Sequence, residues 1–323
     1  MDAPGANRPR PDEPLALRPM LIERSQILVT GGGGFVGAPT VRALLAAGAR
    51  VRVLDAVAPK RLDGLGCEVV IGDIADAEVV GQACKDVDGV LHLAVLPLTA
   101  ANTEHEAAFQ TNVRGSFNVF RAAGENGVGR VVYSSASSAY GPTAAVPIGE
   151  DHPLRPNAFY PATKAAAEML LRGLAGAYGY SVAILRYMNV YGPGQRAGVV
   201  PAVAQRLLAG ARPQLSGDGT QGFDFVHIED CAGANLLALA AEVDGEAFNV
   251  GHGTSASLNE LVAIIGEILG DPLEPTYTGD PITAPPRVGD VTKARELLGF
   301  EAQVGLVDGL QSVIAELRAA GSG

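Results

Sequence analysis

Short apolar runs alternate with stretches of helical periodicity between residue 26 and about residue 186. Buried strands of a parallel sheet appear as such runs, and helices connect them in βαβ units. The pattern therefore predicts an α/β fold with a doubly wound parallel sheet. The predicted strands are Gln26–Thr30, Arg50–Asp55, Glu68–Ile71, Val87–Leu93, Arg130–Ser134 and Ser181–Arg186, and the main predicted helices are Val41–Ala47, Glu104–Asn126 and Asn157–Tyr178.

The pattern changes after about residue 190. Short helices are predicted at Val199–Ala209, Asp230–Ala241 and Leu258–Leu269, separated by loops rich in glycine and proline, and residues 271–290 contain five prolines. This part is expected to form a smaller C-terminal α/β region that binds substrate, with two strands returning to the main sheet. The predicted division is a leader at 1–24, a dinucleotide-binding domain at 25–186 and a substrate-binding region at 187–323.

Composition and charge narrow the class of protein. Of the 323 residues, 47% are hydrophobic and 18% are charged, which is typical of a globular protein. The formal net charge of −11 argues against nucleic-acid binding, because phosphate backbones favour basic surfaces. No apolar run reaches the roughly 18 residues of a membrane span, so no membrane partner is expected. The five histidines form no ligand pattern, so no metal is expected.

Cysteine usage and the N-terminal segment both favour a cytoplasmic protein. Cys67, Cys84 and Cys231 are widely separated and odd in number, which fits neither a disulfide framework nor metal-ligand spacing. Residues 1–24 contain prolines and charges but lack the apolar core of a signal peptide. We expect them to be a flexible leader.

A glycine-rich turn follows the first predicted strand. Gly31, Gly34 and Gly37 lie in TGGGGFVG (30–37) with the spacing G-x-x-G-x-x-G, and the segment opens a helix. Glycines there permit a tight turn, close backbone approach to a pyrophosphate, and packing of helix on strand. Backbone N–H groups at the helix N-terminus can then bind phosphates. The turn predicts a Rossmann-type dinucleotide site.

Acidic residues at later strand ends refine the choice of cofactor. Asp55 ends the second strand, 18 residues after Gly37, where a carboxylate accepts both ribose hydroxyls of NAD and opposes the 2′-phosphate of NADP. Lys60 and Arg61 follow closely, and we interpret them as solvated loop charges. Asp73, just past the third strand, is expected to contact the adenine, with a helix cap as its alternative role. The predicted cofactor is NAD.

The segment Tyr160-Pro-Ala-Thr-Lys164 begins a predicted helix, with Asn157 as the expected N-cap. Residues four apart lie on one helix face. The ammonium and a positive nicotinamide ring both favour the phenolate, so the pKa of Tyr160 is expected to fall from its reference value of about 10. Tyr160 can then transfer the proton of a substrate hydroxyl during hydride transfer, while Lys164 also anchors the nicotinamide ribose.

Taken together, these motifs resemble the NAD-dependent epimerase/dehydratase group of the extended short-chain dehydrogenase/reductases, whose founding members act on nucleotide sugars. The resemblance extends from about residue 25 to residue 318. The matching segments are TGGGGFVG (30–37), HLA (92–94), NVRGSFNV (112–119), YSSASSAYG (133–141), YPATK (160–164), LRYMNVYGP (185–193), GDGTQGFDFVHIED (217–230) and DVTKARELLGF (290–300).

The resemblance implies site residues as well as a fold. It implies that Tyr160 and Lys164 are catalytic and that Asn189 contacts the diphosphate region of the substrate. It also implies a homodimer in which the helices at 104–126 and 157–178 meet across the subunit contact; packing of these helices against the sheet is the alternative. The implied cofactor-binding residues are Gly31, Gly34, Phe35, Val36, Gly37, Asp55, Asp73, Ile74, Leu93, Ala94, Asn112, Tyr160, Lys164 and Tyr187.

One departure from the family pattern concerns the catalytic hydroxyl. In the family, a Ser or Thr four residues before the tyrosine equivalent to Tyr140 shares the substrate hydroxyl with the catalytic tyrosine. This chain has Ala136 there, between Ser135 and Ser137. Neighbours at a strand end point to opposite faces, so neither serine is a simple replacement. A local kink would present one of them; Ser135 is the preferred candidate and Ser137 the other.

A second departure concerns carboxylic acids. Family dehydratases carry an Asp-Glu pair just before the same tyrosine, and sugar-acid decarboxylases carry a Glu. The corresponding residues here are Ser137 and Ser138. Without an acid the site favours plain hydride and proton transfer, as in an epimerase or a dehydrogenase/reductase.

A third departure concerns the substrate diphosphate. Phe223 stands where the family usually has an arginine that binds this group. The segment that supplies a second arginine reads GDPITAPP and contains none. Arg196 and Arg287 are the candidates to compensate, and Phe223 itself is expected to line the substrate site. Either the nucleotide is bound differently, or the substrate is not a nucleoside-diphosphate sugar.

These features leave three functional hypotheses. The leading one is an NAD-dependent nucleotide-sugar 4-epimerase, acting on UDP-glucose/galactose or UDP-glucuronate/galacturonate by transient oxidation at C4 and return of the hydride. The alternative is an NAD(P)-dependent dehydrogenase or ketoreductase of a sugar or tailoring-type alcohol or ketone. A non-catalytic NAD-sensing or scaffold protein is the third, and the presence of both Tyr160 and Lys164 argues against it.

Overall fold

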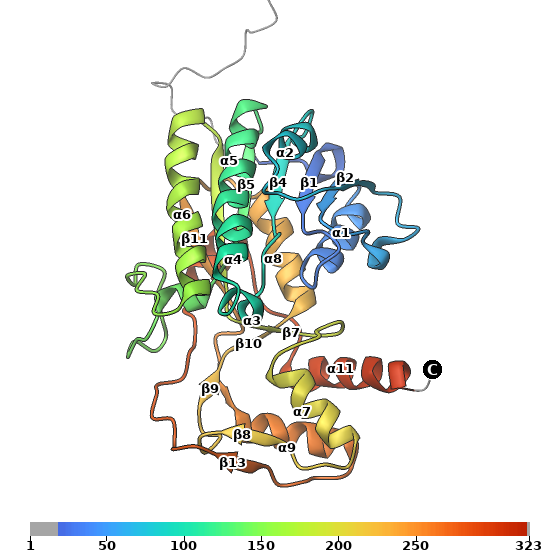
Figure 1. Cartoon of the computed structure of the whole chain (residues 1–323), viewed down its shortest axis with the longest axis vertical. Coiled ribbons are helices and arrows are strands. Elements are labelled where there is room, and N and C mark those ends of the chain that lie inside the picture. The colour runs from blue at the N-terminus through green and yellow to red at the C-terminus, as the bar shows by residue number, and fades with distance from the viewer. Residues whose placement is uncertain (1–18, 322–323) are drawn as a thin grey trace, which may run out of the picture. The chain divides into compact units, whose positions relative to one another are not determined.

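The structure is a computed structural model that describes residues 19–321 (Figure 1). Most of the predicted leader, residues 1–18, lies outside the described residues. The last part of the leader contains a 3-10 turn, η1 (Ile22–Arg24). No helix within residues 19–321 combines the length and the apolar character needed to cross a membrane.

Contacts divide the chain into two compact units, and the chain passes between them more than once. The first unit comprises the chain up to Gly141 together with Leu154–Arg186 and Ala232–Phe248. The second comprises Pro142–Pro153, Tyr187–Cys231 and the chain from Asn249 onward. Each unit is therefore assembled from segments that are distant in the sequence.

A seven-stranded sheet with the order β11-β6-β5-β4-β1-β2-β3 forms the centre of the first unit. The pairs β1–β2, β1–β4, β2–β3 and β4–β5 are parallel, and the strand order is that of a Rossmann fold with β11 added at one edge. The strands are β1 (Gln26–Thr30), β2 (Arg50–Asp55), β3 (Glu68–Ile71), β4 (Gly89–His92), β5 (Arg130–Ala136), β6 (Ser181–Tyr187) and β11 (Glu246–Val250).

All six predicted strands are confirmed, and the largest differences at their ends are two residues, in β4 and β5. The prediction of two returning strands was wrong. Among the described residues after Tyr187, only β11 joins the main sheet. The other strands of that part are two or three residues long and pair with one another.

Helices cover both faces of the sheet because the chain adds strands outward from β1 to β3 on one side and then outward from β4 to β6 on the other. The step from β1 to β2 places α1 (Gly37–Ala46) on one face, and the opposite step from β4 to β5 places α5 (Ser116–Glu125) on the other. Alongside α5 pack α2 (Ala77–Ala83) and α6 (Phe159–Tyr178) (Figure 1). Helix α8 (Ile228–Ala240) lies with α1, because the side-chain amide of Asn235 donates to the Thr40 hydroxyl at 3.0 Å.

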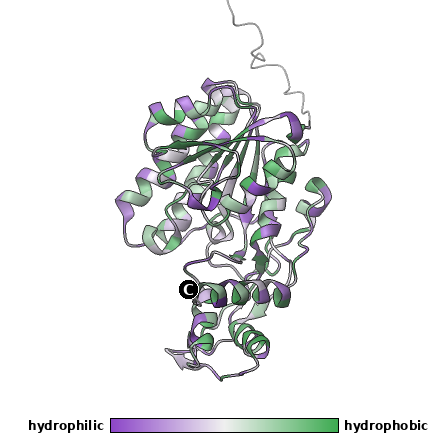
Figure 2. Ribbon diagram, turned by 90° about the vertical axis from the view of Figure 1, so that its right-hand side faces the viewer, coloured by the Kyte–Doolittle hydropathy of each residue, from purple (hydrophilic) through white to green (hydrophobic). Residues whose placement is uncertain are grey.

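The sheet strands carry the core of the first unit, and they are largely green, the colour of hydrophobic residues, in Figure 2. Every residue of β4 and β6 is buried. Strands buried on both faces need apolar residues at successive positions, which is why they appeared as uninterrupted apolar runs in the sequence.

The second unit has its own core between α7 (Val199–Leu208), α9 (Leu258–Leu269) and α11 (Leu306–Gly321). Helix α9 begins with a capping box formed by Ser257 and Glu260 and ends at Gly270 in the left-handed conformation (φ 72°). Its remaining elements are β7 (Asn189–Tyr191), β8 (Gln214–Ser216), β9 (Gly222–Phe223), β10 (Phe225–His227), β12 (Ala256–Ser257), β13 (Thr276–Thr278) and α10 (Thr292–Leu298).

The helix predicted at Glu104–Asn126 differs from the structure. Helix α4 (His105–Ala108) is followed by a π-helical segment, η3 (Phe109–Gly115), and then by α5. Three further short helices are η2 (Lys60–Leu62), α3 (Leu98–Ala101) and η4 (Ser137–Tyr140). Apolar periodicity does not distinguish a π-helical turn from an α-helical one, because the widening affects a single turn.

Candidate active site

The glycine-rich turn between β1 and α1 leaves no room for a side chain at Gly31 or Gly37. Gly31 adopts φ 68°, and a Cβ on it would lie 2.7 Å from the Cα of Ala94. A Cβ on Gly37 would overlap the carbonyl oxygen of Gly31 and approach the Cα of Gly32 to 2.7 Å. Helix α1 begins after Val36 with no capping side chain. The amide of Ala38 donates to the carbonyl of Gly34 at 3.1 Å, so the amides left to meet an anion are those of Phe35 and Val36 just before the helix. This geometry fits the pyrophosphate of a dinucleotide.

The end of β4 lies directly beside this turn. The amide of Leu93 donates to the carbonyl of Thr30 at 3.1 Å, and the amide of Ala94 donates to the Thr30 hydroxyl at 3.3 Å. The structure thus brings Leu93 and Ala94 next to Gly31, as their predicted common role requires. Phe35 and Val36 lie in the turn itself.

Asp55 lies at the end of β2, beside the turn. Its carboxylate accepts a hydrogen bond from the amide of Gly33 at 2.9 Å. Lys60 and Arg61 are exposed in η2, as expected for solvated charges. The carboxylate therefore orders the turn in addition to its predicted contact with a ribose.

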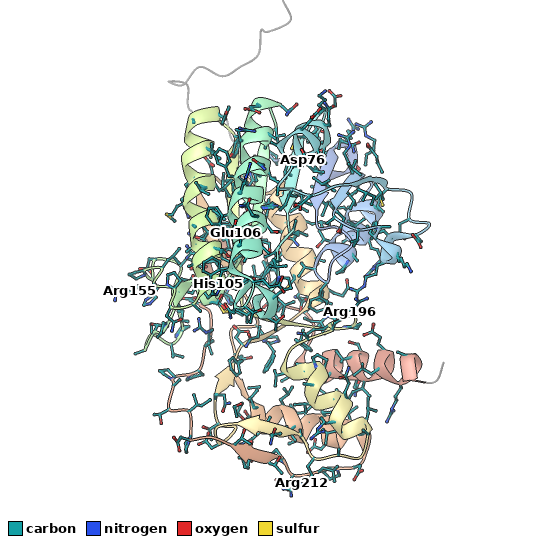
Figure 3. The ribbon with its side chains drawn as sticks, viewed as in Figure 1. Asp76, His105, Glu106, Arg155, Arg196 and Arg212 are labelled. Carbon is teal, nitrogen blue, oxygen red and sulfur yellow. The ribbon has the colours of Figure 1, made fainter. Side chains whose placement is uncertain are left out.

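The alternative role of Asp73 as a helix cap was wrong. The cap of α2 is Asp76 (Figure 3), which accepts hydrogen bonds from the amides of Glu78 and Val79. Asp73 is exposed, and its carboxylate accepts from the amide of Ala75 at 2.9 Å in a turn after β3. Ile74 is buried beside it. Adenine contact therefore remains the prediction for Asp73.

Asn112 connects the loop after β4 to the helix that carries Tyr160. Its side-chain oxygen accepts from the amide of Leu96 at 2.7 Å, and its side-chain nitrogen donates to the hydroxyl of Thr163 at 3.2 Å. Asn112 lies in the π-helical segment η3, and such segments occur frequently at functional sites. The residue was predicted by resemblance, whereas the π-helix was not predicted.

The expected N-cap of α6 was wrong. The residue before the helix is Ala158, which has no capping side chain, and Asn157 is exposed. Instead, the side-chain oxygen of Asn102 accepts from the amide of Tyr160 at 3.2 Å, and the ring of His105 (Figure 3) lies 4.6 Å from that of Phe159. The cap comes from a residue 58 positions away, which no local sequence pattern indicates.

Lys164 is almost completely buried beneath the strand end, with 3% of its surface exposed. Its ammonium donates to the carbonyl of Ser134 and lies 4.6 Å from the centroid of the Tyr133 ring. Burial lowers its pKa to about 7, and the carboxylate of Glu168 opposes that change.

The pKa of Tyr160 differs from the expectation. Burial raises it to about 12 in the protein by itself, whereas we expected a fall. The expected fall depended on two positive charges, and the protein supplies only the ammonium of Lys164. The other belongs to the nicotinamide ring.

The predicted substrate residues Asn189, Arg196, Phe223 and Arg287 lie in the second unit. Asn189 begins β7, and its amide donates to the carbonyl of Asp224 at 2.8 Å. Phe223 lies directly opposite Arg287 in an isolated parallel bridge, so the two residues are backbone neighbours. Arg196 (Figure 3) is exposed in the loop before α7. Tyr187 ends β6 and is buried.

Comparison with known proteins identifies the family. The model of the NAD dependent epimerase/dehydratase family matches residues 27–251. The chain belongs to this family. It is 34% identical over 312 residues to a UDP-glucose 4-epimerase of Mycolicibacterium smegmatis, covering 90% of this chain and 98% of the relative.

Solved structures agree with this assignment. A UDP-glucose 4-epimerase from Thermotoga maritima, determined with UDP-glucose, is 33% identical, with a TM-score of 0.85 over 91% of this chain and 99% of its own. A UDP-glucuronic acid 4-epimerase from Bacillus cereus, determined with UDP-glucuronic acid and NAD, is 26% identical, with the same TM-score and coverage. The predicted family, α/β fold and dependence on NAD are confirmed.

The position of Ser135 gives it a role that the family resemblance did not suggest. Its hydroxyl donates to the carboxylate of Glu168 at 2.5 Å, so the hydroxyl hydrogen is directed to this carboxylate and not to a substrate. Ser137 is buried at the start of η4. The hydroxyl oxygen of Ser138 is also buried, and it has no hydrogen-bond partner among residues 19–321. These positions leave the identity of the catalytic serine a prediction.

The sequence analysis missed Glu168 and Arg186, which form a buried ion pair beside the catalytic residues. A signal was present in the sequence. Glu168 follows Tyr160 and Lys164 at helical spacing on the face expected to be buried, and Arg186 lies inside an apolar strand. Charged residues at such positions are rarely buried unless they are paired.

Proposed function

We propose that this chain is a nucleotide-sugar 4-epimerase that uses NAD and acts on UDP-hexoses or UDP-hexuronates. One observation carries the proposal. Tyr160 and Lys164 are present on α6, while η4, which follows the neighbouring strand, presents Ser137 and Ser138 and no carboxylate. Elimination of water needs an additional acid and base, whereas epimerisation needs only hydride and proton transfer.

Residues of the first unit are proposed to bind the cofactor and to transfer the proton. The glycine-rich turn binds the pyrophosphate of NAD through backbone N–H groups, and Asp55 accepts hydrogen bonds from the ribose. When bound, NAD supplies a hydride acceptor in one direction and a donor in the other. Tyr160 takes the proton from a sugar hydroxyl and returns it, and Lys164 favours the phenolate by its charge. Ser135 or Ser137 contributes the second hydroxyl contact.

Three residues of the second unit, Asn189, Arg196 and Arg287, are proposed to bind the nucleotide part of the substrate. Asn189 would contact the diphosphate region. Arg287 is backbone-paired with Phe223, the position at which relatives usually carry an arginine, so its guanidinium can take over the contact with phosphate. Burial lowers the pKa of Arg287, and a phosphate anion beside the guanidinium would oppose that change by stabilising the charged form. Arg196 is exposed and can meet the outer phosphate.

Incubation of the purified protein with UDP-glucose, UDP-galactose, UDP-glucuronate and UDP-galacturonate tests the proposal. We expect one pair to interconvert without net change of the NAD/NADH ratio. Absence of interconversion of all four sugars by a protein that contains NAD would overturn it. Tyr160→Phe serves as the matched inactive control, because it removes only the hydroxyl.

A second candidate is a dehydrogenase or ketoreductase without nucleotide recognition. It is favoured by Phe223, whose ring packs against Phe225 with the centroids 6.2 Å apart and so presents an apolar surface instead of a cation. Sustained production or consumption of NADH with an alcohol or ketone that lacks a nucleotide would support this candidate over the epimerase.

We also propose a cytoplasmic homodimer. Helices α5 and α6 pack against each other, and Met169 on the outer side of α6 is 55% exposed, as is suitable for a subunit contact. The three cysteines are free, which fits a reducing compartment. Light scattering of the purified protein measures its mass in solution, and a monomer would contradict the dimer.

A further inference from the structure

An ion pair lies inside the first unit, between α6 and β6. Glu168 is 0% exposed and Arg186 is 4% exposed. Two N–H groups of the guanidinium donate to the two carboxylate oxygens, at 2.8 Å and 3.1 Å. Desolvation of two charges is tolerated only where further hydrogen bonds satisfy them. The additional partners of this pair are therefore informative.

Those partners are Ser135, near the end of β5, and Tyr140, the last residue of η4. The hydroxyl of Ser135 donates to Glu168 at 2.5 Å. The guanidinium of Arg186 donates to the hydroxyl of Tyr140 at 3.0 Å and also lies 4.9 Å from the centroid of its ring. Residues 135–140, which include the whole of η4, are thus attached at both ends to one buried ion pair.

The same carboxylate lies one helical turn beyond Lys164. Tyr160, Lys164 and Glu168 are spaced by four residues on α6, so their side chains share one face of the helix. The ammonium of Lys164 has no room for solvation, because it lies between the Tyr133 ring and the Ser134 carbonyl. Glu168 supplies the negative charge on this face of the helix that favours the ammonium.

We propose that Glu168 is a positioning residue of the active site. Its carboxylate, fixed by Arg186, keeps the buried Lys164 ammonium charged beside Tyr160 and turns the Ser135 hydroxyl toward the protein interior. The consequence for catalysis rests on the proposed function, because it assumes that Tyr160 and Lys164 act on a substrate hydroxyl. The effect on the charge of Lys164 does not rest on it.

The surroundings of Lys164 support this role. The titratable and charged groups that face Lys164 and Glu168 are His92 on β4, Tyr133 on β5, Tyr140 on η4 and Arg186 on β6. Burial lowers the pKa of His92 to about 3, so that ring is neutral, and burial raises the pKa of Tyr133, so that phenol is neutral. Glu168 is therefore the group among them that stabilises a positive charge on Lys164.

Titration of Lys164 by NMR tests the proposal without substrate or cofactor. The sequence contains four lysines, Lys60, Lys85, Lys164 and Lys293, so carbon-13 labelling of lysine gives few Cε resonances. Lys164→Arg identifies the resonance of interest. In Glu168→Gln, which keeps the shape and removes the charge, we expect the titration midpoint of Lys164 to fall by about one pH unit or more.

Two further variants provide controls. Glu168→Asp keeps the charge, and its midpoint should remain near that of the unmodified protein. Arg186→Gln removes the cation that competes for Glu168, and its midpoint should rise. An unchanged midpoint in folded Glu168→Gln overturns the proposal. If that variant does not fold, Arg186→Gln decides the question by the direction of its shift, and a fall or no shift overturns it.

The activity measurement is separate. The high-pH limit of hydride transfer should move to lower pH in Glu168→Gln, because Tyr160 loses its charged neighbour earlier in the titration. A purely structural role would lower activity at every pH without moving this limit. Failure of the unmodified protein to act on any sugar would contradict the proposed function and would leave the NMR result standing.

Discussion

The glycine-rich turn after β1 and the catalytic end of β5 with α6 are built on opposite physical principles. The turn depends on positions that carry no side chain: a Cβ on Gly37 would overlap the carbonyl oxygen of Gly31. The catalytic end works through side chains buried with their charges, as in Lys164, Glu168 and Arg186. In the turn, binding of an anion relies on backbone N–H groups that need no neutralising partner, whereas buried side chains must be neutralised by one another.

The difference determines how each region responds to substitution. Added volume damages the turn at Gly31 and Gly37, because the nearest atoms there belong to the backbone, which cannot move aside as a flexible side chain can. Removal of a charged side chain damages the catalytic end, because each buried group there forms a hydrogen bond with another that would then lose its partner. The predictions below test this contrast.

Tyr160→Phe should have the largest effect. It removes the proton-transferring hydroxyl while keeping the ring, so kcat should fall by about 10²- to 10⁴-fold. The glycine-rich turn is unaffected, so the bound NAD measured after denaturation should equal that of the unmodified protein. Loss of NAD together with activity would show that the two regions are not independent.

Gly37→Ala should weaken the binding of NAD more than it slows catalysis by the enzyme that has NAD bound. A methyl group there forces the start of α1 away from β1, so the affinity for NAD should fall by roughly 100-fold, the equivalent of losing one or two hydrogen bonds to a charged phosphate. Isothermal titration calorimetry measures the affinity.

Gly173→Ala is the matched control for that change. Gly173 lies within α6, and a Cβ on it would meet nothing within 4 Å. Alanine should therefore raise the free energy of unfolding by about 0.5–1 kcal/mol and leave NAD affinity unchanged. Equal loss of NAD affinity in both variants would refute the steric explanation.

The same contrast explains what could be predicted from the sequence. The spacing of Gly31, Gly34 and Gly37 is itself the geometry of the turn, so the position of the turn and of Asp55 beside it could be predicted, although the hydrogen bond from Gly33 to Asp55 could not. At the catalytic end the sequence predicted Tyr160, Lys164 and two candidate serines, but not Glu168 or Arg186. Their supporting contacts join residues far apart in the sequence, as between Ser135 and Glu168.

Other local rules failed for a related reason. Asn157 fits the preference for an N-cap, but tertiary contacts place Asn102 at the amide of Tyr160. Asp73 was weighed as a helix cap, yet Asp76 is the residue at the start of α2. Asn102 is brought to α6 by tertiary contacts that the local sequence does not show, whereas at α2 two acidic residues three positions apart were both suitable and the helix begins after the second.

Asp55→Asn should weaken NAD binding by about 10- to 100-fold, because a hydrogen bond to a charged acceptor contributes about 1.5–3 kcal/mol. It also removes the charge that opposes a 2′-phosphate, so the ratio of NAD to NADP affinity should fall further than NAD affinity itself. Titration with both cofactors measures the ratio. An unchanged ratio would show that Asp55 serves only to order the turn through Gly33.

The smallest expected effects are on the free energy of unfolding, and they distinguish Ser135 from Ser138. Ser135→Ala removes a hydrogen bond to a buried carboxylate, so the free energy of unfolding should fall by about 1–3 kcal/mol. Ser138→Ala removes a buried hydroxyl for which the described part of the chain offers no hydrogen-bond partner, so stability should stay the same or rise. Urea denaturation of the cofactor-free protein measures both. A loss in Ser138→Ala as large as that in Ser135→Ala would mean that both hydroxyls have partners inside the protein, and η4 would then offer no hydroxyl at position 138 to a substrate.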